Sequence, residues 1–214
     1  MRVVFDLDGT LIDSAADIRG IANAVLAGEG AAPLDMYETR AFIGHGTDTF
    51  VARMRAARGL PDADHPRLLA DFLSRYDGAV GLTVPYPGVP EALGALAARG
   101  HALGICTNKP IGPCRHVLEH LGLLDLFGTV LGGDSLPARK PDPAPLEAAL
   151  DALGTGPAVY VGDSEVDAET AQRAGRPFLL FEGGYRHADV AAIPCAASFA
   201  DWGDLPALAA RHAA

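Results

Sequence analysis

The chain has 214 residues and a formal net charge of −10 at pH 7; 49% of its residues are hydrophobic and 21% are charged. This composition supports a packed core and excludes an intrinsically disordered chain. The acidic balance argues against a nucleic-acid-binding surface, which needs clustered Lys and Arg, so we expect no nucleic-acid partner.

The cysteines and the first residues of the chain further restrict the class of protein. The three cysteines are odd in number and include no CxxC pair, which predicts neither a disulfide framework nor a zinc site. The first residues lack the apolar run of a signal peptide, and no apolar stretch reaches membrane length. We therefore expect a cytoplasmic protein without a membrane partner.

The first expected element is a short buried strand that ends in two carboxylates. Apolar and β-branched residues from Val3 onward predict the strand, and Asp6, Asp8 and the pair Gly9-Thr10 stand at its C-terminal end. In open α/β sheets, ligands bind at that end. Two carboxylates at one place repel each other unless a cation lies between them or one holds a proton. A metal-assisted site is therefore favoured over a plain Asp-Gly turn.

The region that follows is expected to be entirely helical. Apolar residues at helical spacing predict helices over 15–27, 35–42, 47–58 and 64–79. We expect no strand between Phe5 and Thr83. The break at Gly44-His45-Gly46 separates the second helix from the third. Residues 13–83 are thus expected to form an all-helical cap domain, inserted at the ligand-binding end of the sheet and able to exclude water.

From residue 84 onward, strands and helices alternate. We expect strands over 101–106, 129–131, 158–161 and 177–181, and helices over 89–99, 111–121, 144–153, 166–174 and 202–211. This βαβ pattern predicts an α/β fold: a Rossmann-like parallel sheet with helices on both faces. The first strand needs partners and joins this sheet. The core domain is then 1–12 plus 84–214.

Two further expected strand ends carry polar groups. Thr107, Asn108 and Lys109 follow the strand over 101–106, where a hydroxyl and free N–H groups could bind phosphate oxygens or cap the next helix. Lys140 precedes Pro141 in a stiff loop, and it could neutralise a carboxylate cluster or remain a solvated loop lysine. Lys109 and Lys140 are the chain's two lysines among 17 basic residues, which favours a specific need for an ammonium group.

A second acidic pair follows the strand over 158–161. Asp163 stands at the end of that strand and Asp167 is four residues later, in the first helical turn. Asp167 has a sufficient structural reason, since a carboxylate favours a helix N-terminus. Asp163 has none, and it fits an oxygen-rich Mg²⁺ site together with the first acidic pair.

The order of these motifs resembles the haloacid dehalogenase (HAD) superfamily over essentially the whole chain. Asp6 to Thr10 matches its DxDG(T/V) motif, and Thr107 its strand-ending Thr or Ser. Lys140 matches its lysine before proline, and Gly162 to Asp167 its GDxxxD motif. The helical insert resembles the cap of one subgroup of this superfamily. The resemblance implies the HAD fold.

The resemblance also implies roles for the matching residues. Asp6 would be the nucleophile that forms an aspartyl phosphate, and Asp8 the general acid and base. Asp6, the main-chain carbonyl of Asp8, and Asp163 would hold Mg²⁺. Thr107 would bind phosphate oxygens, and Lys140 would pair with Asp6 and the phosphate.

Two flanking residues complete the implied metal and phosphate set. Asn108 would add an amide to the phosphate site beside Thr107. Asp167 belongs to the implied metal group and would act through Lys140 or a metal-bound water rather than on the metal directly.

Within the superfamily the chain is most similar to bacterial phosphoglycolate phosphatases. The similarity rests on the runs from Phe5 to Ser14, Ile43 to Gly46, Tyr86 to Val89, Thr107 to Pro110 and Lys140 to Pro143. We therefore expect hydrolysis of 2-phosphoglycolate, a small acidic phosphomonoester. A phosphatase for sugar phosphates or nucleotides, and a non-catalytic phosphate-binding module, stay as alternatives.

The remaining expectations concern substrate contacts and assembly. Substrate-binding residues are expected in the first motif, in the loop after the strand over 101–106, and in the cap at the break Gly44-His45-Gly46 (the cap loop) and the helix after it. They are Gly9, Thr10, Gly44, His45, Gly46, Thr47, Arg53, Asn108 and Lys109. A plain helix–helix turn with a surface histidine is the alternative for the cap loop. The protein is expected to be a monomer or a homodimer.

Overall fold

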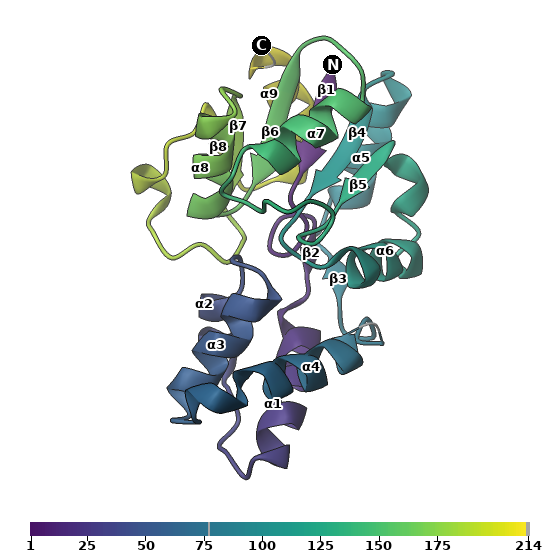
Figure 1. Ribbon diagram of the computed structural model, residues 1–214. Coiled ribbons are helices and arrows are strands. Elements are labelled where there is room, and N and C mark those ends of the chain that lie inside the picture. The colour runs from purple at the N-terminus through teal and green to yellow at the C-terminus, as the bar shows by residue number, and fades with distance from the viewer. Residues whose placement is uncertain (77, 213–214) are drawn as a thin grey trace.

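The computed structural model describes residues 1–76 and 78–212 (Figure 1). The chain forms two parts. One is a parallel sheet flanked by helices, and the other is a group of four helices that lies beyond one end of the sheet (Figure 1). This arrangement confirms the predicted α/β fold with an inserted helical cap.

The sheet contains six strands, all parallel, in the order β5-β4-β1-β6-β7-β8. They are β1 (Arg2–Phe5), β4 (Ala102–Cys106), β5 (Thr129–Leu131), β6 (Ala158–Gly162), β7 (Phe178–Phe181) and β8 (Ala197–Phe199). The first strand is central: Val3 pairs with Leu103 of β4 on one side and with Val159 of β6 on the other. The chain order reverses beside β1, and a ligand site is expected at such a point.

Helices cover both faces of the sheet because side chains alternate along each strand. Val3 and Phe5 of β1 face one layer, and Val4 faces the other. The first layer contains α5 (Val89–Ala98), α6 (Ile111–His120) and α9 (Leu205–His212). The second contains α7 (Ala144–Ala152) and α8 (Glu165–Arg173). The strand β1 is thus buried on both faces, as its apolar run predicts.

The helical part has its own apolar core. It contains α1 (Ala15–Gly28), α2 (Met36–Phe42), α3 (Thr47–Ala57) and α4 (His65–Tyr76), with a 3₁₀ turn at Asp62–Asp64. The rings of Phe50 and Phe72 lie 5.3 Å apart between α3 and α4. The helix α2 begins with a complete capping box formed by Asp35 and Glu38, which fixes its start.

Two short strands carry the chain between the parts. The strand β2 (Ile12–Asp13) pairs antiparallel with β3 (Val84–Pro85). The expectation of no strand between Phe5 and Thr83 is therefore wrong. Two residues are too few for a periodic signal, and their partner is about seventy positions away. The domain boundaries, 1–12 with 84–214 and 13–83, stay a prediction; both crossing points lie at this ladder.

The end of the chain also differs from expectation. The expected helix over 202–211 is a 3₁₀ turn at Trp202–Asp204 followed by α9, and β8 was not anticipated. The side chain of Asp201 accepts a hydrogen bond from the Gly203 N–H and caps the short turn. The Trp202 ring packs against Phe181 and Phe199, 5.3 Å from each ring centroid, and closes the core behind the two last strands.

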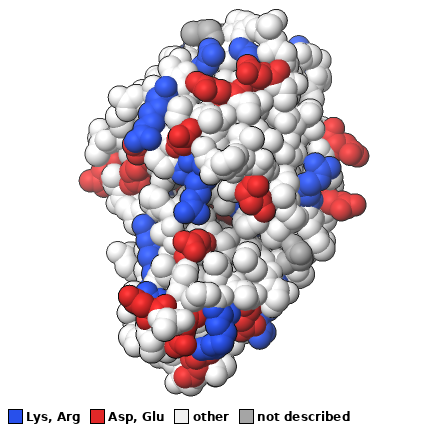
Figure 2. All heavy atoms as spheres, viewed as in Figure 1, with Lys and Arg blue, Asp and Glu red and all other residues white. Residues whose placement is uncertain are grey.

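The surface carries mixed charges on the face drawn in Figure 2. Basic and acidic side chains alternate over both parts of the molecule there, so this face presents no extended basic strip. Among the described helices, none combines the length and apolar character needed to cross a membrane.

We expect the core leucine Leu93 to contribute far more to stability than the exposed Leu82. Leu93 of α5 is fully buried against the sheet, whereas Leu82 is 65% exposed. The change Leu93→Ala should lower the free energy of unfolding by about 2–5 kcal/mol, through lost burial and the cavity it leaves. The matched change Leu82→Ala should stay within about 0.5 kcal/mol. Urea unfolding measures both, and equal effects would contradict the assigned layer.

Candidate active site

The carboxyl ends of β1, β4 and β6 bring most of the predicted site residues together. Asp6 follows β1, Thr107 follows β4 and Asp163 follows β6. The turn after Asp6 depends on Gly9, which has φ +87°, a conformation that L side chains rarely adopt. A Cβ atom on Gly9 would also lie 2.6 Å from Asp163 Oδ2. Gly9 thus allows the loop after β1 to approach Asp163 at the C-terminal end of β6.

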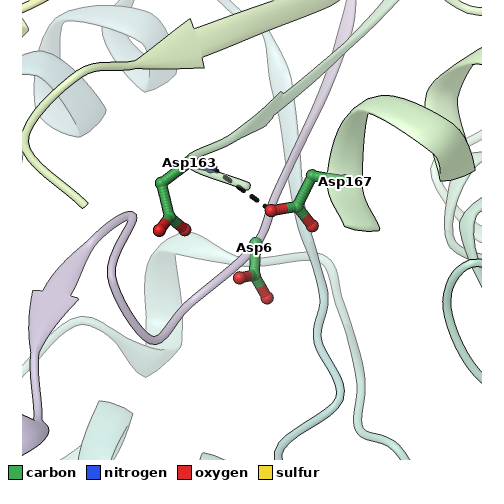
Figure 3. A group of neighbouring side chains, drawn as sticks. All are labelled: Asp6, Asp163 and Asp167. Atoms are coloured by element: carbon green, nitrogen blue, oxygen red, sulfur yellow. Dashed lines mark hydrogen bonds between the residues drawn. The ribbon is translucent and has the colours of Figure 1, made fainter. Parts of the chain in front are cut away.

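Asp6, Asp163 and Asp167 form one buried acidic cluster (Figure 3). Each offers a carboxylate oxygen, and these oxygens lie within 4.8 Å of one another. Figure 3 shows the three side chains converging from the end of β1, the end of β6 and the start of α8. Such a group of oxygens suits a hard cation such as Mg²⁺.

The three carboxylates are held in different ways. Asp167 accepts hydrogen bonds at both oxygens: Oδ1 from Lys140 Nζ at 2.6 Å, and Oδ2 from the Ser164 hydroxyl, also at 2.6 Å. Asp163 Oδ1 accepts from the Thr10 hydroxyl at 2.7 Å, and its Oδ2 from the Tyr185 N–H at 2.6 Å. Asp163 accepts one hydrogen bond at each oxygen, whereas Asp167 Oδ2 accepts three, from the Asp163 N–H and from the N–H and hydroxyl of Ser164. Asp167 is therefore placed to orient Lys140, and Asp163 keeps more room to bind a cation.

Lys140 is buried and uses its ammonium group on three partners. Its Nζ lies 2.8 Å from Asp6 Oδ1, 2.6 Å from Asp167 Oδ1 and 2.9 Å from the Tyr160 hydroxyl. The strongest influence on Lys140 is burial, which lowers its pKa; the charges of Asp167 and Asp6 outweigh it and leave the pKa above the ordinary value. Lys140 therefore stays charged and partly neutralises the acidic cluster.

One ammonium group does not balance three carboxylates. Burial is the main reason that the pKa of Asp6 is raised from 3.8 to about 6; Lys140 lowers it and the Asp167 charge raises it. Burial, followed by the charges of Asp167 and Asp6, raises the pKa of Asp163 well above its usual range. The residues present therefore fit a divalent cation, which would relieve this excess of negative charge through Asp6 and Asp163.

The side chain of Asp8 lies outside this cluster. Its Oδ1 accepts a hydrogen bond from the Ser14 hydroxyl at 2.5 Å and one from Lys109 Nζ at 3.2 Å. Lys109 Nζ also donates to the Tyr76 hydroxyl of α4 at 2.9 Å. The two carboxylates of the first motif are thus separated: one faces the acidic cluster, and the other faces a lysine and the helical part.

A pocket lies between the sheet end and the helical part. It is lined on the sheet side by Asp6, Asp8, Thr107, Asn108 and Lys109, and on the helical side by Ile18, Ile43, Gly44, Gly46, Thr47, Phe50, Phe72 and Tyr76. Its polar end is formed by the first-motif carboxylates and Lys109, and its other walls are mostly apolar. A small anionic ligand would be enclosed between the acidic cluster and α3.

Asn108 links the two sides of this pocket. Its side-chain Nδ2 donates to the carbonyl of Gly44 at 3.0 Å and to the carbonyl of Lys140 at 3.1 Å. The Asn108 side chain is therefore hydrogen bonded to the cap loop, Gly44-His45-Gly46, and to the loop that carries Lys140. The predicted phosphate contact of Asn108 stays a prediction, and these two bonds leave its main-chain N–H for it.

Four predicted substrate residues, Gly9, Thr10, His45 and Arg53, do not line this pocket. The Thr10 hydroxyl is directed to Asp163, and an Arg53 guanidinium nitrogen donates to the Ala41 carbonyl at 3.2 Å. His45 lines a neighbouring hollow with Glu165 and His187, and the carboxylates Asp6, Asp8 and Asp163 line the same hollow. Desolvation, with Arg53 and His187 nearby, lowers the pKa of His45 and favours its neutral form. The Thr10 hydroxyl thus orients the Asp163 carboxylate and does not line the pocket.

Sequence reasoning missed several residues that hold the site. Tyr76, Tyr160 and Ser14 are not among the predicted site residues, yet their hydroxyls contact Lys109, Lys140 and Asp8 in that order. Tyr160 is fully buried, and its hydroxyl lies 2.9 Å from Asp167 Oδ1. A buried tyrosine in a strand needs a polar partner for its hydroxyl, and this is the signal that could have identified Tyr160.

We expect cation affinity to depend on pH through Asp6. A proton and a cation compete for this carboxylate, so the affinity for Mg²⁺ should be about tenfold weaker at pH 5 than at pH 7.5. Without cation, the raised pKa stabilises the fold below about pH 4, and this contribution is lost as the pH rises through about 6. Calorimetric titration at both pH values measures the affinity, and equal dissociation constants would contradict this.

Known proteins were compared with the chain as a whole. The family model described as haloacid dehalogenase-like hydrolase matches residues 3–181. A protein of Cereibacter sphaeroides named phosphoglycolate phosphatase is 49% identical over 212 residues, which cover 98% of this chain and 97% of that protein. One of Rhodobacter capsulatus with the same name is 44% identical over 209 residues, covering 96% of this chain and 95% of that one.

A solved structure agrees with these relatives. The crystal structure of a "predicted phosphoglycolate phosphatase" from Haemophilus somnus superposes with a TM-score of 0.90 at 30% identity, covering 97% of this chain and 96% of that one. The family match spans most of the sheet part and the whole helical part. The chain therefore belongs to the haloacid dehalogenase-like hydrolases.

Proposed function

We propose that the protein is a Mg²⁺-dependent phosphomonoesterase that hydrolyses 2-phosphoglycolate through an aspartyl phosphate on Asp6. The enzyme class follows from the relatives: the chain is a phosphatase. The observation that carries the mechanism is the separation of the two first-motif carboxylates. Asp6 faces the acidic cluster and Lys140, whereas Asp8 faces Lys109 and the pocket.

In the first step Asp6 acts as the nucleophile. Lys140 holds Oδ1 at 2.8 Å, which leaves the other oxygen for attack on phosphorus. A bond forms between that oxygen and phosphorus while the bond from phosphorus to the substrate oxygen breaks. The carboxyl group of Asp8 gives its proton to the leaving oxygen, so an alcohol departs.

In the second step Asp8 acts as the base. It takes a proton from a water molecule, whose oxygen attacks phosphorus, and the bond from phosphorus to Asp6 breaks. Phosphate leaves, and Asp6 and the protonated Asp8 are regenerated. The Ser14 hydroxyl and Lys109 keep Asp8 in one orientation through both transfers.

The other groups stabilise charge on the transferring phosphoryl. Thr107 and Asn108 line the same pocket as Asp6, and we assign the Thr107 hydroxyl and the Asn108 main-chain N–H to the phosphate oxygens. When bound through Asp6, the Asp8 carbonyl and Asp163, Mg²⁺ supplies positive charge to this phosphoryl. Asp167 keeps Lys140 directed at Asp6.

The identity of the substrate rests on the relatives and on the pocket. The relatives bear the name phosphoglycolate phosphatase, and the pocket has one polar end at the sheet, mostly apolar walls and the start of α3 on its cap side. At the cap end, α3 begins at Gly46-Thr47 with no side-chain cap, so its free N–H groups could receive the glycolate carboxylate. Lys109 lines the same pocket and contacts Asp8, so its ammonium group stands at the phosphate end of such a substrate.

We expect Asp8→Asn to abolish most turnover. An amide cannot exchange the proton that both steps need, so kcat should fall about 10²- to 10⁴-fold while the fold is retained. The matched change Asp151→Asn alters an exposed residue of α7 and should leave kcat unchanged. Phosphate release under saturating 2-phosphoglycolate measures both. Full turnover in Asp8→Asn would refute the acid–base assignment.

We expect removal of divalent cations to stop catalysis reversibly. Without a cation, the buried cluster repels the phosphoryl group, so dialysis against a chelator should abolish phosphate release and added Mg²⁺ should restore it. Far-ultraviolet circular dichroism of the treated protein separates this loss from unfolding. A rate unaffected by the chelator would refute the cation requirement.

We expect the cap end to select the substrate carboxylate. Over a panel of phosphomonoesters, kcat/KM should favour 2-phosphoglycolate by about tenfold or more, which is about 1.4 kcal/mol of transition-state binding. Thr47→Val removes a hydroxyl that lines the pocket beside the N–H groups at the start of α3, so it should reduce this preference, while the matched Thr49→Val, outside the pocket lining, should retain it. A flat profile, or one favouring sugar phosphates or nucleotides, would discard phosphoglycolate and keep the core mechanism.

A further inference from the structure

Tyr185 touches the acidic cluster through its main chain. It follows Gly183-Gly184 in the loop after β7, and its N–H donates to Asp163 Oδ2 at 2.6 Å. A Cβ atom on Gly184 would collide with the Asp163 side chain, so the loop approaches this carboxylate as closely as glycine permits. A movement of the Asp163 side chain would therefore require a movement of this loop.

The phenol of Tyr185 touches the crossing point between the two parts. Its hydroxyl accepts from the N–H groups of Ser14 and Ala15 at 2.9 and 3.1 Å, and it donates to Asp13 Oδ1 at 2.6 Å. These three bonds use the one proton and two lone pairs of the hydroxyl. The tyrosine is buried and packs with the apolar core of the helical part.

This contact binds main-chain N–H groups at the start of α1. Ser14 stands at the N-cap position, yet its side chain makes no capping bond. Tyr185 accepts from the N–H groups of Ser14 and Ala15, the second of which also donates to Asp13 Oδ1 at 3.2 Å, and the Ser14 hydroxyl donates to Asp8 Oδ1 at 2.5 Å. One side chain from the sheet part therefore fixes the start of the first cap helix, and Ser14 with it.

We propose that Tyr185 is a positioning residue that couples cation binding at Asp163 to the position of the cap. The proposal rests on the cation site of the proposed function. Its physical basis is a short rigid path: Asp163 holds the Tyr185 main chain, and the Tyr185 phenol holds Asp13, Ser14 and Ala15. We call residues 13–15 the hinge, and closed when the three Tyr185 hydroxyl bonds to them are formed. A cation that fixes Asp163 favours the closed hinge, and by reciprocity the closed hinge favours the cation.

The variant Tyr185→Phe separates coupling from mere structure. It keeps the N–H bond to Asp163 and the ring packing, and it removes the three hinge bonds at once. A role confined to the hinge leaves the dissociation constant for Mg²⁺ unchanged. Coupling raises this constant, and we expect a change of about fivefold or more, the lower end of typical coupling between sites.

The control is Tyr37→Phe, which removes the hydroxyl of a tyrosine on α2 that is 83% exposed. Isothermal titration with Mg²⁺ gives the dissociation constants, and Mn²⁺ titration followed by electron paramagnetic resonance repeats them with a second cation. Ser14→Ala serves as a third variant. It keeps the phenol bonds to the main chain and loses the bond to Asp8, so it should lower kcat and leave the cation affinity at the wild-type value.

Hydrogen exchange gives the reciprocal readout. In the wild-type protein, Mg²⁺ should slow exchange in the peptide that contains residues 13–17, and in Tyr185→Phe this effect of Mg²⁺ should disappear. Equal dissociation constants for wild type and Tyr185→Phe, or the same Mg²⁺-dependent protection in both, would overturn the coupling alone. Absence of Mg²⁺ binding to the wild-type protein would overturn the cation site of the proposed function, and the coupling with it.

Discussion

An excess of buried negative charge is the constraint on which the rest of this structure depends. Asp6, Asp163 and Asp167 share one small volume, and a single ammonium group, that of Lys140, stands among them. Buried charges of one sign are expensive unless they are paired and hydrogen bonded. The neighbouring donors, among them Thr10, Ser164 and Tyr160, keep the carboxylates in place. They do not neutralise the remaining negative charge, and a bound cation would.

The same constraint explains why the site extends into the helical part. Asp8 is directed away from the acidic cluster, and its partners, Ser14 and Lys109, connect it to α1 and α4. Asn108 connects the loop after β4 to the cap loop. The helical part therefore does more than cover the pocket, because it sets the orientation of groups that belong to the sheet.

Much of the fold and the core of the site could be predicted from the sequence, because strong local signals mark them. Buried strands of four or five residues with acidic or hydroxyl ends identified β1, β4 and β6. The strand β2 escaped because two residues carry no periodicity and their partner is distant in sequence. The strand β8 escaped because its residues, Ala-Ser-Phe, lack the β-branched side chains that marked β5, a strand of the same length. Tyr160 and Tyr185 escaped for another reason: a hydroxyl's partner is fixed by tertiary contacts that no local pattern contains.

The ladder of β2 and β3 has a consequence for how such an enzyme can diversify. The chain leaves the sheet part at Asp13 and returns at Val84, and these two residues are paired across the ladder. An insert whose ends already meet can change its length or its fold without shifting the register of the six parallel strands. Recombination could therefore exchange substrate preference as a block, provided that the incoming segment restores partners for Tyr185 and Asn108.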